Sequence, residues 1–212
     1  MTRGAPAALS EPGYLFDGEP LPESFYARDA EQVARDLLGA VLISQVDATP
    51  CAAQIVEAEA YVGPHDPASH GAERIGRTTR NRALFGPPGR AYVYRSYGIH
   101  WCLNAVSASD GYPSGVLLRA ARPLAGDDAI AARRPGREPR EWLRGPGNLA
   151  RGLGVTADLN GHPLDHVPLH ILQGERVADA CVRRGPRVGV SRAADWPLRF
   201  WVAESPWVSR RV

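Results

Sequence analysis

The sequence predicts an α+β fold, with a single mixed domain built on an antiparallel β-sheet, surrounding helices and a protruding β-hairpin. Several segments alternate polar and apolar residues with the period of a strand. These strands cluster without the regular alternation with long helices that marks a doubly wound sheet. Residues 80–104 have the pattern of one hairpin with a glycine at its turn. The chain has 212 residues, 44% of them hydrophobic, which suffices for the core of one domain.

The first elements follow a segment without periodicity. Residues 1–22 are rich in Pro, Gly and Ala and predict a flexible lead-in, so the domain is expected to span residues 23–212. Its first helix begins at Asp29, a residue type that caps helices by accepting backbone N–H bonds. Two strands are then expected over about residues 41–45 and 53–62.

The elements after the hairpin are expected in a fixed order. They are a buried strand over 115–124, a short helix over 125–134, one or two helices over 136–155 broken at Gly145-Pro146-Gly147, and late strands near 187–190 and 199–203.

The charge is distributed unevenly along the chain. Residues 1–66 contain 3 arginines and 11 acidic residues, whereas residues 67–212 contain 22 arginines and 12 acidic residues. The segment from Pro67 to Asn104 contains six arginines but only one acidic residue, Glu73, and aromatic residues occur among the arginines. The basic part is therefore suited to a surface that faces phosphates.

The composition excludes several classes of protein. All 25 Lys or Arg positions are arginine, which rules out a phosphate-binding loop lysine and a lysine Schiff base. The three cysteines, at positions 51, 102 and 181, form no C-x-x-C pair and predict core thiols rather than disulfides or a zinc site. No apolar run is long enough to span a membrane, and no secretion signal is recognisable, so we expect a cytoplasmic protein, nucleoid-associated if bacterial.

The hairpin allows two interpretations. Tyr92 and Tyr94 fall on one strand face, and Tyr97-Gly98 falls at the turn. The same stretch carries four arginines, namely Arg80, Arg82, Arg90 and Arg95. A tyrosine at the tip could wedge between base pairs while arginines hold phosphates. Tyrosine is also an ordinary strand residue, so the hairpin could equally be part of the core.

The strand around residue 57 concentrates acidic groups. Period two places Glu57, Glu59 and Tyr61 on one face. A carboxylate in a partly dry cleft can deprotonate a water molecule. The alternative, favoured on these residues alone, is a pair of edge-strand charges neutralised by arginines. Arg119, inside the apolar run VLLRAA, is expected to pair with Glu57 or Glu59 or to contact substrate.

The histidines offer a rival site. Three of them are spaced by four residues, at His162, His166 and His170, but intervening prolines rule out the regular helix that would bring them to one metal ion. We therefore expect no metal and no other cofactor. His70, in the loop after Tyr61, lies nearer the acidic strand.

Five segments occur in an order that resembles a known family. They are IVEAEAYVGPHDPASH, RTTRNRALFGPPGRAYVYRSYGIHWCLNAVS, VLLRAARPL, GPGNLARGLGV and RVGVSRAADWPLRFWV. From about Phe25 to Val208 the chain resembles the alkyladenine (3-methyladenine, N-methylpurine) DNA glycosylases of the animal and bacterial type. The resemblance implies a domain that scans duplex DNA and flips a damaged purine into a pocket.

The resemblance also implies roles for individual residues. Tyr97 would intercalate, and Tyr61, His70 and Tyr94 would form an aromatic cage that favours cationic, alkylated purines. Glu59 would activate the attacking water, with Arg119 holding both groups. Asn104 would exclude the 2-amino group of guanine. Arg80, Asn81 and Arg82 would contact backbone phosphates, although each of these three could instead form surface ion pairs.

The function implied is that of a monofunctional DNA glycosylase. It would hydrolyse the N-glycosidic bond of 3-methyladenine, 7-methylguanine, hypoxanthine or ethenoadenine, act as a monomer on double-stranded DNA, and leave an abasic site. Some family members have lysine at the position of Asn148, which puts its DNA contact in doubt. The rival functions are a lesion-binding protein that flips bases without cutting, and a metal-dependent hydrolase.

Overall fold

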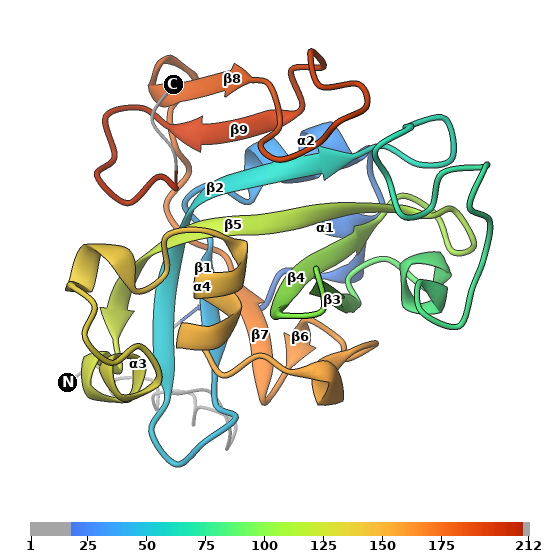
Figure 1. The fold of residues 1–212 in the computed structure, drawn as a ribbon. Coiled ribbons are helices and arrows are strands. Elements are labelled where there is room, and N and C mark those ends of the chain that lie inside the picture. Colours follow the sequence, from blue (N-terminus) through green and yellow to red (C-terminus); the bar gives the residue numbers. More distant parts are fainter. Residues whose placement is uncertain (1–17, 210–212) are drawn as a thin grey trace, which may run out of the picture.

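The long strand β2 (Cys51–Tyr61) organises the sheet. β5 (Ser114–Ala125) pairs with one edge of β2 along most of its length. The other edge is shared by β1 (Val41–Ser44) near the start of β2 and β9 (Arg199–Val202) near its end. This computed structural model describes residues 18–209, and it is a single mixed α+β domain with a curled antiparallel sheet (Figure 1).

The rest of the sheet extends from both edges of this centre. Within residues 18–209 the sheet has nine strands, in the order β3-β4-β5-β2-β1-β7-β6, with β9 pairing both β2 and β8. The outer strands are β3 (Ala91–Ser96), β4 (His100–Ser107), β6 (Asp165–His166), β7 (Leu169–Leu172) and β8 (Val182–Gly185). Every pairing is antiparallel, which confirms the predicted fold class.

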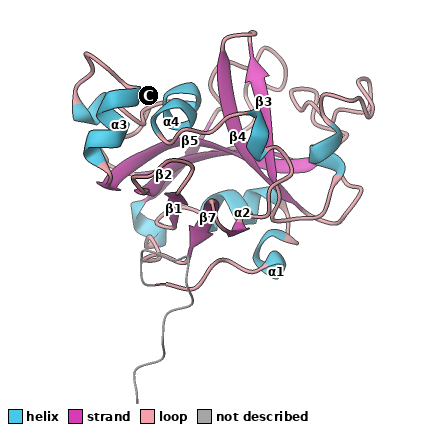
Figure 2. Cartoon of the chain, turned by 90° about the horizontal axis from the view of Figure 1, so that it is seen from below, coloured by secondary structure: helices cyan, strands magenta, loops and turns pink. Residues whose placement is uncertain are grey.

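Short helices cover both faces of the sheet. They are α1 (Glu23–Tyr26), α2 (Ala30–Asp36), α3 (Asp127–Arg133) and α4 (Pro146–Gly152). Single 3₁₀ turns occur at Arg82–Phe85, Pro139–Glu141, Ala157–Leu159 and Asp179–Cys181. In Figure 2 the β3–β4 hairpin projects from the sheet on the same side as α3 and α4, whereas α1 and α2 lie on the opposite side. No helix among the described residues is long and apolar enough to cross a membrane.

The core begins at the N-terminal end of the described chain. Leu21 is buried, and its N–H donates to the carbonyl of Ile171 at 2.8 Å, so packing starts before residue 23. Residues 1–17, most of the predicted lead-in, lie outside the described residues. Asp29 stands at the N-cap of α2 as predicted, although its side chain makes no capping hydrogen bond.

Two expectations for the later part of the chain need correction. The strand expected near residues 187–190 is wrong, because β8 lies earlier, at Val182–Gly185. Pro186 cannot donate to a ladder, and the N–H of Val188 bonds a carboxylate instead of a strand. The expected interruption over 136–155 lies at residues 142–145, slightly before the predicted place, because Pro146 begins α4 and proline suits the first position of a helix.

Candidate active site

Two carboxylates on β2 and one arginine on β5 form the centre of the site. The β2–β5 register slips on both sides of Glu57, and the side chain of Arg119 contacts both Glu57 and Glu59. Both glutamates are fully buried. Because β2 has partners on both edges, the interpretation as edge-strand charges is wrong, while the expected pairing of Arg119 is confirmed for both glutamates.

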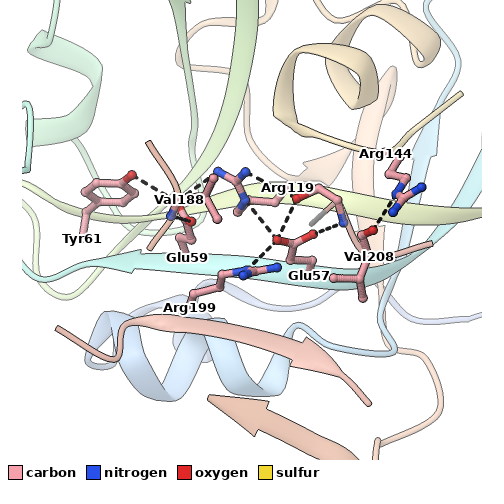
Figure 3. A network of polar contacts seen from close by, with 9 residues as sticks. Glu57, Glu59, Tyr61, Arg119, Arg144, Val188, Arg199 and Val208 are labelled. Carbon is pink, nitrogen blue, oxygen red and sulfur yellow. Dashed lines mark hydrogen bonds and ion pairs between the residues drawn. The ribbon is translucent and has the colours of Figure 1, made fainter. Parts of the chain in front are cut away.

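Glu59 receives three hydrogen bonds or ion contacts (Figure 3). The N–H of Val188 donates to Oε1 at 2.7 Å. The hydroxyl of Tyr61 donates to Oε2 at 3.2 Å, and Nη1 of Arg119 lies 3.3 Å from the same oxygen. Burial raises the pKa of Glu59, and Arg119 and the Val188 N–H oppose this rise only in part. A carboxylate with a raised pKa is a stronger base than an exposed one.

A cavity of about 550 Å³ lies against this cluster. It is lined by seven of the residues singled out from the sequence, namely Tyr61, His70, Arg80, Tyr94, Tyr97, Asn104 and Arg119. Glu59 lies one layer behind the wall, since its partners Tyr61, Arg119 and Val188 line the cavity and it does not. Any water that reaches Glu59 from the cavity therefore passes these three residues.

Aromatic rings form one wall of the cavity. The rings of His70 and Tyr94 lie edge to face with centroids 4.3 Å apart, and Tyr92 stacks on Tyr94 at 5.4 Å. Nδ1 of His70 lies 3.0 Å from the hydroxyl of Tyr92. Burial, with a smaller contribution from the charge of Arg80, lowers the pKa of His70, so the imidazole is neutral at neutral pH. Asn104 donates from Nδ2 to the carbonyl of Tyr92 at 3.0 Å, which fixes its amide.

A buried ion pair joins the two loops on either side of the cavity. Arg187 donates to both carboxylate oxygens of Asp66, at 2.5 and 2.9 Å, and both side chains are fully buried. The same guanidinium lies over the ring of Tyr61, 4.6 Å from its centroid. Sequence reasoning missed this pair, because nothing local links residues 121 positions apart. Asp66 also accepts hydrogen bonds from the N–H groups of Val62 and Ala68. An aspartate in a turn is the local sequence signal that could have drawn attention to this residue.

The hairpin tip presents a tyrosine to solvent. Tyr97 is 88% exposed, and both Tyr97 (φ 49°) and Gly98 (φ 69°) are left-handed, as a type I′ turn requires. The left-handed region is uncommon for a bulky residue and costs free energy. A tyrosine is kept here although asparagine or glycine would fit more easily, which points to a use for its side chain.

The predicted backbone-contact residues separate into two kinds. Arg80 and Arg82 are exposed, and Arg80 donates to the carbonyl of Arg95 at 2.6 Å. Asn81 is only 3% exposed, and its amide bonds the carbonyls of His70 and Gly76. Asn81 therefore holds the loop that carries Arg80 and His70.

Two further arginines, which the sequence analysis did not single out, line the cavity. Arg74 and Arg192 are exposed and come from the loops on either side of it. With Arg80, they add three exposed guanidinium groups to the buried Arg119 in the cavity lining, a distribution suited to binding phosphates.

The C-terminal histidines do not gather into a cluster with other ligating groups. His162 contacts the carbonyl of His166 at 2.8 Å, His166 pairs with Asp165, and His170 is buried in β7. Among residues 18–209 no three His, Cys, Asp or Glu side chains are placed to hold one metal ion.

The chain matches known proteins over most of its length. The family model of methylpurine-DNA glycosylase (MPG) matches residues 24–206. A relative from Methanoculleus marisnigri is 45% identical over 199 residues, covering 90% of this chain and 99% of its own. Relatives from Rhodopseudomonas palustris strain HaA2 (45% over 198 residues, 93% of each chain) and Koribacter versatilis (46% over 196 residues, 90% and 93%) are similar. Each is named provisionally as a 3-methyladenine DNA glycosylase. The chain therefore belongs to the methylpurine-DNA glycosylase family and is a DNA repair enzyme that hydrolyses N-glycosyl bonds.

Proposed function

We propose that this enzyme excises alkylated and deaminated purines by direct attack of water on the anomeric carbon of the flipped nucleotide. The observation that carries the proposal is the burial of Glu59, with a raised pKa, directly behind an aromatic cavity. The proposed substrates are 3-methyladenine, 7-methylguanine, hypoxanthine and ethenoadenine. The product is an abasic site with an intact backbone.

The contacts of Glu59 suggest where the water binds. Oε1 is held at 2.7 Å by the N–H of Val188, whereas the two contacts to Oε2 are longer, at 3.2 and 3.3 Å. A water at Oε2 would replace the Tyr61 hydroxyl and lie beside the guanidinium of Arg119. Its oxygen bonds to C1′, the N-glycosidic electron pair leaves with the purine, and Glu59 takes the proton. The negative charge of Glu59 also stabilises the oxocarbenium character that develops at the sugar.

The cavity wall supports a preference among bases. The π faces of Tyr61 and Tyr94 and the neutral imidazole of His70 attract a positively charged purine more strongly than a normal base. Asn104, held by Tyr92, occupies the position we propose for exclusion of the guanine 2-amino group. Discrimination is then partly attraction to damaged bases and partly repulsion of a normal one.

Contacts at the hairpin tip and on the neighbouring loop would place the enzyme on the duplex. We propose that Tyr97, exposed at the hairpin tip, fills the gap left by the flipped nucleotide. Arg80 and Arg82 contact backbone phosphates, and Asn81 contributes by holding their loop. One cavity in one chain serves one lesion, so the proposed active form is a monomer.

The test uses duplexes with a single hypoxanthine or ethenoadenine, incubated with the enzyme in the presence of a chelator. Strand breakage is measured before and after hot alkali. We expect breakage only after alkali, because the product is an intact abasic strand and the chain has no lysine to open it. Breakage without alkali, or activity that the chelator abolishes, would overturn the mechanism. Binding without an abasic product from either lesion would indicate a lesion sensor.

A further inference from the structure

Glu57 and Glu59 share one arginine but lie in different surroundings. Among residues 18–209, the partners of Glu59 all line the cavity, whereas Arg119 alone of the partners of Glu57 does so. The two carboxylates are therefore not interchangeable. One is separated from the cavity by a single layer, and the other lies deeper in the sheet.

Glu57 is surrounded by hydrogen-bond donors. Its Oε1 accepts from Nε of Arg119 at 3.1 Å, from Nε of Arg199 at 2.7 Å and from the hydroxyl of Ser209 at 2.9 Å. Its Oε2 accepts from the N–H of Ser209 at 2.6 Å. With four donors, two of them cationic, Glu57 is a fixed anion rather than a base for water.

We infer that Glu57 is a positioning residue for base excision, which anchors the Nε side of Arg119 so that Nη1 faces Glu59, and which keeps the buried cluster electrically balanced. The inference rests on the proposed function, because it takes Glu59 as the base. Without the Glu57 anchor, the fork of Arg119 is free to chelate both oxygens of Glu59. That arrangement would occupy the oxygen that the water needs.

The charge balance leads to a second consequence. Glu57 and Glu59 offset Arg119 and Arg199, so loss of the Glu57 charge leaves one excess positive charge in a buried site. A nearby positive charge favours the ionised carboxylate and lowers the pKa of Glu59, which weakens it as a base. The titratable and charged groups around Glu59 are Glu57 and Tyr61 on β2, Arg119 on β5, Tyr94 on β3, Cys102 on β4, Arg199 on β9, and Arg187 in the loop before β9.

The C-terminal end of the described chain closes this cluster. Ser209 supplies two of the four donors to Glu57, and the preceding carbonyl of Val208 accepts from Nε of Arg144 at 2.6 Å (Figure 3). Val208 and Glu57 are both buried. The anchor of Arg119 thus depends on a segment about 90 residues away from it in sequence.

The experiment measures single-turnover base release from a hypoxanthine duplex, at saturating enzyme, as a function of pH. For Glu57→Gln we expect the maximal rate to fall about tenfold. We also expect the acid limb of the profile to move down by about one pH unit, because the excess positive charge acts on Glu59. The double variant Glu57→Gln/Arg199→Gln removes one charge of each sign, so its acid limb should return towards the wild-type position.

The outcomes separate positioning from simple structural support. An acid limb that stays in place in Glu57→Gln, with only a lower melting temperature, would overturn the inference. If Glu57→Gln does not fold, Ser209→Ala decides, because it removes one neutral donor at the end of the described chain. It must lower the rate of base release and leave duplex affinity unchanged, and an unchanged rate overturns the inference. If Glu59→Gln releases the base at the wild-type rate, the proposed function itself has failed. If Glu59→Gln is inactive while Glu57→Gln keeps both the wild-type rate and the wild-type acid limb, the inference alone has failed.

Discussion

Burial shifts the pKa values of Glu59 and His70, the two titratable groups most important to the proposed chemistry, in opposite directions. Removal from water disfavours the charged form of either group, so it raises the pKa of Glu59 and lowers the pKa of His70. At neutral pH the cavity therefore combines a strengthened base with an uncharged imidazole. A protonated imidazole would repel a cationic base at the same position.

The pH dependence of lesion binding tests the state of His70. The lowered pKa keeps His70 neutral above that pKa, and a positive charge develops only as pH falls through it. We expect affinity for a duplex with cationic 7-methylguanine to fall below that point, while affinity for one with neutral hypoxanthine falls less. Titrations of catalytically inactive Glu59→Gln enzyme measure both. The control His70→Gln should remove the difference, and a difference that persists would assign it to another group.

Asn104 carries the proposed rejection of guanine. Asn104→Ala removes the amide that Tyr92 holds, so we expect release of unmodified guanine to rise about tenfold, as for a repulsive contact of this size. Guanine release from undamaged duplex DNA is the measurement. Release of hypoxanthine, which lacks the 2-amino group, is the control and should change much less. Equal changes for both bases would mean that Asn104 only supports the wall.

At the scale of elements, the cavity depends on two loops that the ion pair Asp66–Arg187 holds together. Asp66→Asn leaves a buried guanidinium charge without its counter-ion, which typically costs about 3–5 kcal/mol. We expect a loss of unfolding free energy in that range, measured by chemical denaturation, together with weaker lesion binding. Asp36→Asn, which breaks the partly exposed pair with Arg28, is the matched control and should cost less than about 1 kcal/mol. If both variants lost a similar amount of unfolding free energy, the buried pair would contribute no more to stability than the partly exposed one.

Local patterns predicted the elements well where one period governed a segment. The hairpin follows from alternation and its turn residues, and β5 was predicted as a buried strand over an apolar run. The short helix α3 also lies within its predicted range. The strand near 187–190 failed because long-range contacts, to Asp66 and Glu59, determine the backbone there. For the same reason, the sequence did not predict the ion pair of Arg187 or the two hydrogen bonds that Ser209 donates to Glu57. By contrast, Arg119 was predictable, since an arginine inside an apolar run requires a buried partner.

For the whole molecule, the uneven charge has a structural counterpart at the cavity. Arg74, Arg80 and Arg192 line it, on a chain whose formal net charge is only +2. Tyr97, at the tip of the hairpin, lines the same cavity, so we expect the proposed wedge and the basic groups to approach the duplex together. Such a local field attracts DNA although the average charge is small.

The salt dependence of DNA binding measures how many phosphates are contacted. We expect Arg80→Gln and Arg192→Gln each to reduce the slope of log affinity against log salt by about 1, for damaged and undamaged duplexes alike. Arg183→Gln is the control, because Arg183 is exposed on β8, lies outside the cavity lining, and donates to the nearby carbonyls of Ala180 and Val182. Its slope should equal that of the wild type. An unchanged slope for Arg80→Gln would mean that Arg80 does not contact a phosphate.

If Glu59 is the base that activates water, its loss must slow base release without weakening DNA binding. Single-turnover release of hypoxanthine is measured for wild-type and Glu59→Gln enzyme at saturating concentration, with duplex affinity measured in parallel. We expect Glu59→Gln to bind the lesion duplex as the wild type does but to release the base at least about a hundredfold more slowly. Release at the wild-type rate would contradict it and require another group to accept the proton.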